Sequence, residues 1–336
     1  MELTTVWFAL IALLWAGYFL LEGFDFGVGV LLPVLGRDDR ERRLLINTIG
    51  PVWDGNEVWL IMAGAATFAA FPEWYATLFS GFYLPLFAIL IALILRGVAL
   101  EYRGKRDEPF WRHRMDLMIA VGSLLPALLW GVAFGNIVRG VPLDADHEYV
   151  GSFGTLLNPF ALLGGLTFVA VFVTHGAIFL ALRTTDDLRV RANRLATRVG
   201  AVAAVLAIAF LWWAQALRGD TVSAVLTVAA VVAFAGGLVA NLLRREGWAF
   251  AGTTAAIGLA VVSLFTALFP DVMPSTLDPG STLTVVGAAS SAYTLKAMTI
   301  ITAIFLPLVM LYQGWTYWVF RKRVTVEPVP APVSAP

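Results

Sequence analysis

Long apolar runs separated by short polar breaks are the dominant pattern along this chain of 336 residues. A helix that crosses a lipid bilayer needs about 20 consecutive, mainly apolar residues. A scan for such runs predicts nine membrane-spanning helices. The predicted segments are 6–34, 52–71, 77–99, 116–138, 157–182, 197–217, 221–242, 248–269 and 290–320. The fold class that follows is an all-α, polytopic membrane protein.

The nine segments predict a single transmembrane domain over 1–323, followed by a proline-rich cytoplasmic tail, 324–336, that is expected to be disordered. The spacing of the segments is typical of two four-helix bundles plus one helix. A pseudo-repeat of 1–140 and 152–272, with 290–320 as the extra helix, is therefore one interpretation. No shared motif accompanies it, so the repeat depends on the helix count alone.

Arginine and lysine are distributed very unevenly between the two sets of connections. One side carries twenty basic residues, whereas the other carries two, Arg139 and Arg218. Because basic residues gather on the cytoplasmic side of membrane proteins, we expect the N-terminus outside and the C-terminus in the cytoplasm. The N-terminal residues before the first segment include Glu2 and form no basic n-region, so we interpret this segment as a retained helix and not as a signal peptide.

Composition agrees with a membrane protein and excludes several other classes. Hydrophobic residues make up 59% of the chain, charged residues make up 14%, and the mean hydropathy is +0.80. Soluble domains carry about 25% charged residues. The formal net charge is zero and the sequence has no basic tract, which argues against nucleic acid as a partner. Cysteine is absent, which excludes disulfides, thiolate metal sites and cysteine nucleophiles.

Two acidic residues fall deep inside the first apolar segment. Glu22 and Asp25 lie three residues apart, so they share one face of a helix. Counted back from Leu32 at about 1.5 Å per residue, Asp25 lies roughly 10 Å and Glu22 roughly 15 Å from the inner end. An ionised acid at that depth costs several kcal/mol unless it is paired, hydrated or protonated. The pair is therefore either a buried structural contact or part of a hydrated proton path from the cytoplasm.

Asp54 and Glu57 form a second acidic pair, in the first two turns of the segment that begins near Pro51. Acids near a helix N-terminus stabilise the helix dipole, which alone can account for both side chains. The alternative is that they form the inner mouth of the same proton path. Glycines within 23–29 would allow a close helix approach beside that path.

Candidate metal ligands are scarce in this sequence. His175 is the only histidine within a predicted span, and a bis-histidine heme site would need a second one there. We expect His175 to form a hydrogen bond with a neighbour and to bind no metal. Lys296, in the last segment, is expected either to snorkel outward or to pair with an acid. The sequence has no phosphate-binding loop, nucleophile elbow or metal-ligand cluster.

Distinctive motifs recur from the first segment to the last. They are "EGFDFGVG" (22–29), "GPVWDGNEVWL" (50–60), "FSGFYLPL" (79–86), "LRGVALEYR" (95–103), "GVAFGNIVRGVP" (131–142), "LLNPF" (156–160), "FPDVMPS" (269–275) and "SSAYTL" (290–295). With these motifs the chain resembles subunit II of the cytochrome bd-type quinol oxidases over nearly its whole length. The pairing of "GFDFG" with a later "WDGNEVWL" is the most specific part of the resemblance.

The resemblance implies a heterodimer with a homologous, heme-bearing subunit I in the bacterial plasma membrane. Complexes of that family oxidise quinol and reduce dioxygen to water, and they take the protons from the cytoplasm, which generates proton-motive force. The larger subunit holds two b-type hemes and one heme d, while the second subunit is generally heme-free and in some members holds a structural quinone. Membrane lipid and a small accessory subunit are further partners that the resemblance suggests.

By their positions in the matching motifs, the resemblance implies that Asp25 and Asp54 belong to the family's proton route, with Trp53 beside them. Glu22 stands where some members have aspartate, which keeps an acid at that place, and Glu57 completes the predicted pathway. No catalytic residue and no metal ligand are expected in this chain.

Arg96 and Glu101 fall in the motif "LRGVALEYR", at the inner end of the third segment. The resemblance implies a structural ion pair or a site entrance there. Lys296 varies within the family, so no role is assigned to it.

The residues alone leave two rival functions open. Intramembrane carboxylates and nine spans also suit a stand-alone proton-coupled transporter, which would keep its activity when purified alone. A third interpretation makes the chain a scaffold for the heme-bearing subunit, in which case neutralising the acids would leave turnover intact. The family resemblance favours the oxidase subunit.

Overall fold

The computed structural model describes residues 2–325, and the predicted disordered tail falls almost entirely on 326–336, outside the described residues. The α-helices are α1 Leu3–Leu35, α2 Asp39–Ile49, α3 Trp53–Ala70, α4 Pro72–Gly81, α5 Tyr83–Tyr102, α6 Pro109–Arg139, α7 Pro159–Arg183, α8 Asp186–Arg218, α9 Thr221–Leu242, α10 Glu246–Leu268 and α11 Ala292–Val319. The short elements are the 3-10 helices η1 Arg103–Lys105, η2 Phe153–Leu156 and η3 Pro279–Ser281, and the strands β1 Asp271–Met273 and β2 Leu283–Thr284.

Eight helices of the described chain are long and apolar enough to cross a membrane: α1, α5, α6, α7, α8, α9, α10 and α11. They confirm a polytopic helical membrane protein. The predicted segment 77–99 began too early, because its first residues belong to α4, which is separate from α5.

The remaining predicted segment, 52–71, corresponds to α3. Its 18 residues extend over about 27 Å, close to the thickness of the bilayer core. Asp54, Asn56 and Glu57 make its first turns polar, so its 18 residues are less apolar than the 18-residue stretch that each of the eight helices above contains. The predicted count of nine spans stays a prediction.

Short sequence signals set the helix ends. Proline occupies the first position of α4, α6 and α7, as Pro72, Pro109 and Pro159. An N–H at that position has no intrahelical partner, so proline costs the helix no hydrogen bond there. Four N-cap side chains accept a backbone N–H from the first turn: Asp38, Asn158, Asp220 and Ser291.

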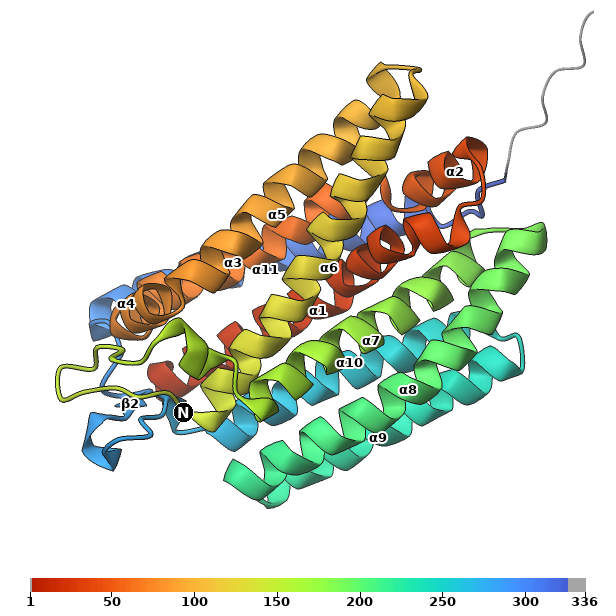
Figure 1. Cartoon of the computed structure of the whole chain (residues 1–336). Coiled ribbons are helices and arrows are strands. Elements are labelled where there is room, and N and C mark those ends of the chain that lie inside the picture. Colours follow the sequence, from red (N-terminus) through yellow and green to blue (C-terminus); the bar gives the residue numbers. More distant parts are fainter. Residues whose placement is uncertain (1, 326–336) are drawn as a thin grey trace, which may run out of the picture.

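Helix α1 lies at the centre of the molecule and packs against α3, α6, α7 and α10. In the second half of the chain, α7 packs against α8 and α10, and α9 packs against the same two helices, which closes a four-helix group. Figure 1 shows this group as long helices running side by side, with α3, α5 and α6 on the other side of α1.

Glycine brings α1 and α7 into backbone contact. A Cβ atom built on Gly27 would lie 2.0 Å from the carbonyl oxygen of Phe172, and one built on Gly176 would lie 2.6 Å from the backbone of Gly27. Small residues permit such approaches between membrane helices. This contact fixes the depth and rotation of the part of α1 that carries Glu22 and Asp25, as expected for the glycines of 23–29.

Replacing Gly176 with alanine is expected to destabilise the folded protein by about 1–3 kcal/mol, because the new methyl group would meet backbone that cannot move aside. The matched control is Gly64→Ala in α3, where a Cβ would meet nothing within 4 Å. Thermal unfolding of the two purified variants measures the difference. Equal stability of the variants would contradict the close contact.

Two connections between helices, 140–158 and 269–291, contain short β pairings. Strands β1 and β2 pair antiparallel, and Val141 forms an isolated bridge with Ser275. These connections satisfy backbone groups by pairing within and between each other, while the rest of the fold is helical.

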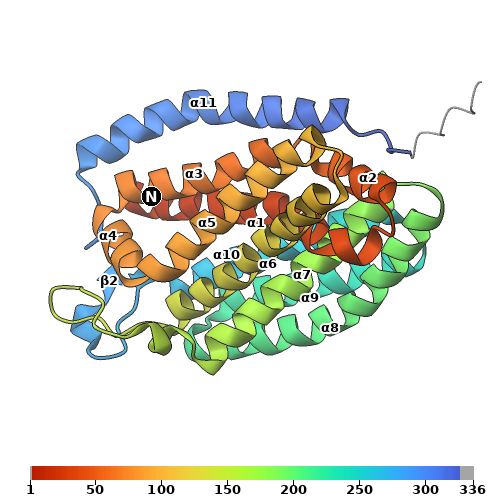
Figure 2. The same cartoon turned by 45° about the horizontal axis from the view of Figure 1, so that its top comes forward.

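Helix α11 lies apart from the bundle along one side of it (Figure 2). Leu295 is the one buried residue among those of α11. Polar contacts hold its two ends. Near its N-terminal end Trp7 Nε1 donates to the Leu295 carbonyl at 3.2 Å. Beyond its C-terminal end, Arg323 Nη1 donates to the Thr184 carbonyl at 2.7 Å and the Val324 N–H donates to the Arg183 carbonyl at 2.8 Å.

Candidate functional site

Glu22 and Asp25 are completely buried in the first long helix. They lie three residues apart on α1, and Phe24 and Phe26, on either side of Asp25 in the sequence, are buried as well. The predicted shared face is therefore a face turned into the protein and away from lipid.

Arg96 is the counter-charge of this site. It reaches the cluster from α5, is completely buried, and its Nη1 donates to Glu22 Oε1 and, at 3.3 Å, to Glu57 Oε1. Its guanidinium also lies 4.9 Å from the centre of the Phe26 ring. A glycine in the facing helix makes room for it, because a Cβ on Gly122 would lie 2.8 Å from the Arg96 Cβ.

Asp25 has a different partner, Asn56 of α3. The Nδ2 group of Asn56 donates to Asp25 Oδ2 at 2.6 Å. Asn56 Oδ1 accepts from the Tyr317 hydroxyl at 2.8 Å and from Gln313 Nε2 at 3.1 Å, both on α11. Asn56 is itself completely buried. Four helices, α1, α3, α5 and α11, thus contribute to one polar site between apolar walls.

Several polar atoms of this site are buried and have no hydrogen-bond partner among the described residues. They are Glu22 Oε2, Asp25 Oδ1, Arg96 Nε and Arg96 Nη2. A buried polar atom without a partner is costly. Water can bond either kind of atom, whereas an added proton changes only a carboxylate, which can then donate as well as accept.

The acids of α3 lie at the boundary between this site and the surface. The Glu57 side chain is 24% exposed. Asp54 is exposed and accepts the backbone N–H of Gly55 at 2.7 Å. Trp53 is half-buried and packs near Gly97 of α5. The structure therefore brings together Glu22 and Glu57 through Arg96, whereas Asp54 and Trp53 lie outside the hydrogen-bonded cluster.

Arg96 forms ion pairs with Glu22 and Glu57, while Glu101, which belongs to the same motif, is exposed and has no share in them. Five residues along a helix turn the side chain by about 140°, so the two side chains of α5 point to different surroundings. The twenty basic residues that the sequence places on one side of the membrane include Arg96, which lies inside α5.

Three members of the site were not predicted: Asn56, Gln313 and Tyr317. Asn56 lies between the two acids of "WDGNEVWL", and the prediction considered only the acids. Gln313 and Tyr317 lie four apart on one face of an otherwise apolar helix, which is the signal that could have marked them.

His175 is completely buried and both of its ring nitrogens have partners. Nδ1 lies 2.7 Å from Thr253 Oγ1, and Nε2 lies 3.2 Å from the Leu20 carbonyl oxygen. The ring also stacks on Phe250 at 4.6 Å. The predicted hydrogen bond of His175 is confirmed, and with both nitrogens bonded this residue does not fit a heme iron. Lys296 is exposed and has no ion pair among residues 2–325.

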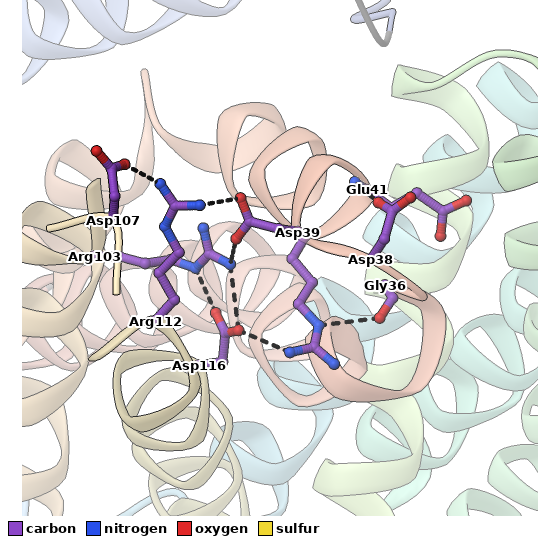
Figure 3. A network of polar contacts seen from close by, with 9 residues as sticks. Gly36, Asp38, Asp39, Glu41, Arg103, Asp107, Arg112 and Asp116 are labelled. Atoms are coloured by element: carbon purple, nitrogen blue, oxygen red, sulfur yellow. Dashed lines mark hydrogen bonds and ion pairs between the residues drawn. The ribbon is translucent and has the colours of Figure 1, made fainter. Parts of the chain in front are cut away.

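A second charged network joins α2, η1 and the first turns of α6 (Figure 3). Asp116 of α6 accepts from Arg103 Nε at 2.5 Å and from Arg42 Nη1 at 3.1 Å. Asp39 of α2 accepts from Arg103 Nη2 at 2.8 Å and from Arg112 Nη1 at 2.7 Å. Acids and arginines alternate along the network, which holds these elements together at the rim of the bundle.

An apolar cavity of about 140 Å³ lies among α1, α7, α8, α9 and α10. Its lining is almost entirely aliphatic and aromatic, and Thr167, the one polar residue in it, already donates to the Leu163 carbonyl. A cavity of this size accommodates about one benzene ring. It offers no free donor to a quinone carbonyl, and the expected structural quinone stays a prediction.

The fold and the site together define a class: a polytopic helical membrane protein with excess acids buried beside one arginine. The comparisons with known proteins identify the family. The sequence profile described as "Cytochrome bd terminal oxidase subunit II" matches residues 3–320, and the chain belongs to this family.

Relatives that match the chain over nearly its full length support this family assignment. The chain is 44% identical to the cytochrome bd ubiquinol oxidase subunit 2 of Bacillus subtilis, covering 96% of this chain and 97% of that protein. It is 36% identical to the cytochrome bd-I ubiquinol oxidase subunit 2 of Escherichia coli, covering 96% of both. A chain of the bd oxidase structure from Geobacillus thermodenitrificans has the same fold, with a TM-score of 0.78 at 18% identity, covering 96% of this chain and 100% of that one. The protein is therefore a multi-pass protein of a bacterial inner membrane.

Proposed function

We propose that this chain is the heme-poor subunit of a quinol:oxygen oxidoreductase and that it carries protons inward from the cytoplasm. The observation that carries the proposal is the complete burial of Glu22, Asp25 and Arg96 inside the helix bundle, with Glu57 at the edge. The names of the full-length relatives, which are subunits of ubiquinol oxidases, support the reaction.

The charge balance of the cluster favours proton binding. Glu22, Asp25 and Glu57 would carry three negative charges when ionised, against one positive charge on Arg96. Uncompensated charge in a low-dielectric interior costs several kcal/mol. Uptake of protons by the carboxylates removes that cost, so the cluster stores and releases protons while the arginine holds the remaining negative charge in place.

The order of the acids suggests the direction of travel. Asp54 is exposed in the first turn of α3, Glu57 lies one turn deeper and is partly exposed, and Glu22 is buried on the far side of Arg96. Protons would enter at Asp54, pass to Glu57 and then reach Glu22 and Asp25 through ordered water. The chemistry that consumes them lies in the partner subunit, since the described residues of this chain do not fit a heme ligand.

The same proposal includes the organisation of the chain. We infer nine spans with α3 among them, an outer N-terminus, and a cytoplasmic rim where α2 and the basic connections lie. The closed group of α7, α8, α9 and α10, with α11 apart, supports a four-plus-four-plus-one arrangement. The partner is the homologous heme-bearing subunit I that the family resemblance implies.

Replacing Asp54 with asparagine in the assembled complex is expected to slow oxygen consumption about threefold and to leave the heme content unchanged, because an exposed entry residue assists proton capture without holding the fold. Asp146→Asn, an exposed acid in an outer connection, is the matched control and should have full activity. Oxygen-electrode rates at saturating quinol measure both variants. Full activity of Asp54→Asn would favour the helix-dipole role for this residue and would remove it from the pathway.

A further inference from the structure

The last helix carries two polar side chains that its own packing does not explain. Most of α11 is exposed to its surroundings, and few of its residues contact α1 or α3. Yet Gln313 and Tyr317, one turn apart, both donate to the same atom, Asn56 Oδ1. Polar side chains inside membrane helices are uncommon and usually have a partner that needs them.

Asn56 is the junction between α11 and the buried acid. Its NH₂ group donates to Asp25 Oδ2 at 2.6 Å, and its carbonyl oxygen accepts two hydrogen bonds from the other side. An amide oxygen has two lone pairs, and both are used here. Donors on the oxygen polarise the amide and strengthen the N–H that Asn56 offers to Asp25.

Asn56 and its two partners on α11 can also reverse their hydrogen bonds. An ionised carboxylate only accepts, so it faces the NH₂ group of Asn56. A protonated Asp25 can donate, and rotation of the Asn56 amide by 180° would then turn its oxygen toward Asp25. The NH₂ group would face α11, where the Tyr317 hydroxyl and the Gln313 side-chain amide can each accept as well as donate.

We propose that Gln313 and Tyr317 are positioning residues for Asp25, which hold the Asn56 amide in one orientation and let it reverse when Asp25 gains or loses a proton. This inference deepens the proposed proton pathway and rests on it. It gives the loosely packed α11 a part in proton transfer in addition to its attachment to the bundle.

A purely structural role makes a different prediction. If Gln313 and Tyr317 only attach α11 to α3, their removal weakens the bundle by the same amount whatever occupies position 25. If they act through Asn56 on Asp25, their effect on turnover requires the carboxyl group of Asp25. A double-mutant cycle separates these two cases.

The experiment uses the assembled complex and the variants Tyr317→Phe, Gln313→Met and Asp25→Asn. Tyr317→Phe and Gln313→Met are each expected to slow oxygen consumption about threefold at unchanged KM for quinol. Each should also move the pH of half-maximal turnover by about half a unit. Tyr312→Phe is the control, because this tyrosine lies on the same helix, is 65% exposed, and its hydroxyl forms no hydrogen bond among the described residues. It should retain the parent rate and pH profile.

In the Asp25→Asn background, which is expected to be about tenfold slower than the parent, Tyr317→Phe and Gln313→Met should add no further slowing and no further shift in the pH profile. Equal slowing in both backgrounds overturns the inference. Parent-like rates for both α11 variants, alongside a slow Asp25→Asn, overturn it while the proposed pathway stands. A fast Asp25→Asn overturns the pathway itself. Should Tyr317→Phe fail to assemble, Gln313→Met alone decides among these outcomes.

Discussion

An Arg96→Met complex is expected to lose about 3–5 kcal/mol of folding free energy, because the substitution removes the one buried cation that faces Glu22 and Glu57. The remaining carboxylates would lie in an apolar interior with no positive charge beside them. We expect little assembled complex in the membrane and a much lower unfolding temperature for the fraction that purifies. Yield and thermal unfolding measure the change.

The control for this variant is Arg114→Met, which removes an exposed arginine from α6 and should leave the yield unaffected. A second, compensated variant tests the cause of the loss. Glu22→Gln combined with Arg96→Met removes one buried charge of each sign, and replacing both partners of a buried pair is often nearly neutral. It should recover much of the yield. If the double variant is as unstable as Arg96→Met, the loss comes from packing and not from charge.

Glu22→Gln alone is the second large expected effect, and it acts on turnover and not on stability. Glutamine still accepts the hydrogen bond from Arg96 but cannot bind or release a proton near neutral pH. Oxygen consumption at saturating quinol should fall about a hundredfold, the lower end of the range over which a positioned proton donor or acceptor contributes. The heme spectrum of the complex should be unchanged.

Glu101→Gln is the matched control for Glu22→Gln. It makes the same chemical change on an exposed side chain near the inner end of α5, and it should leave the rate unchanged. A Glu22→Gln complex that turns over at the parent rate with its hemes intact would contradict the proton pathway and favour the scaffold function.

The acids of α1 could be found from the sequence because depth is a local property. The apolar run around Glu22 and Asp25 predicts a helix, and the rise per residue then gives their distance from its end. The glycines of 23–29 predicted the close contact with another helix for the same reason. A prediction of this kind needs one helix and no knowledge of its neighbours.

The partners of these acids could not be found in this way, because they depend on which helices meet and how each is rotated. Arg96 follows Glu22 by 74 residues, and Gln313 and Tyr317 follow Asn56 by 257 and 261 residues. The rotation of α5 turns Arg96 inward and leaves Glu101 outside, although both belong to one motif. The bridge between Val141 and Ser275 also depends on two loops meeting after the helices have packed.

The order of the helices along the chain has a consequence for biogenesis. Asn56 is synthesised more than 250 residues before Gln313 and Tyr317, so its side-chain carbonyl group lacks these two donors while α4 to α10 are made. The ends of α7 and α10 that Val324 and Arg323 contact likewise gain these partners only after α11 has been made. The side of the bundle beside α1 and α3 therefore stays open until α11 is inserted and closes it.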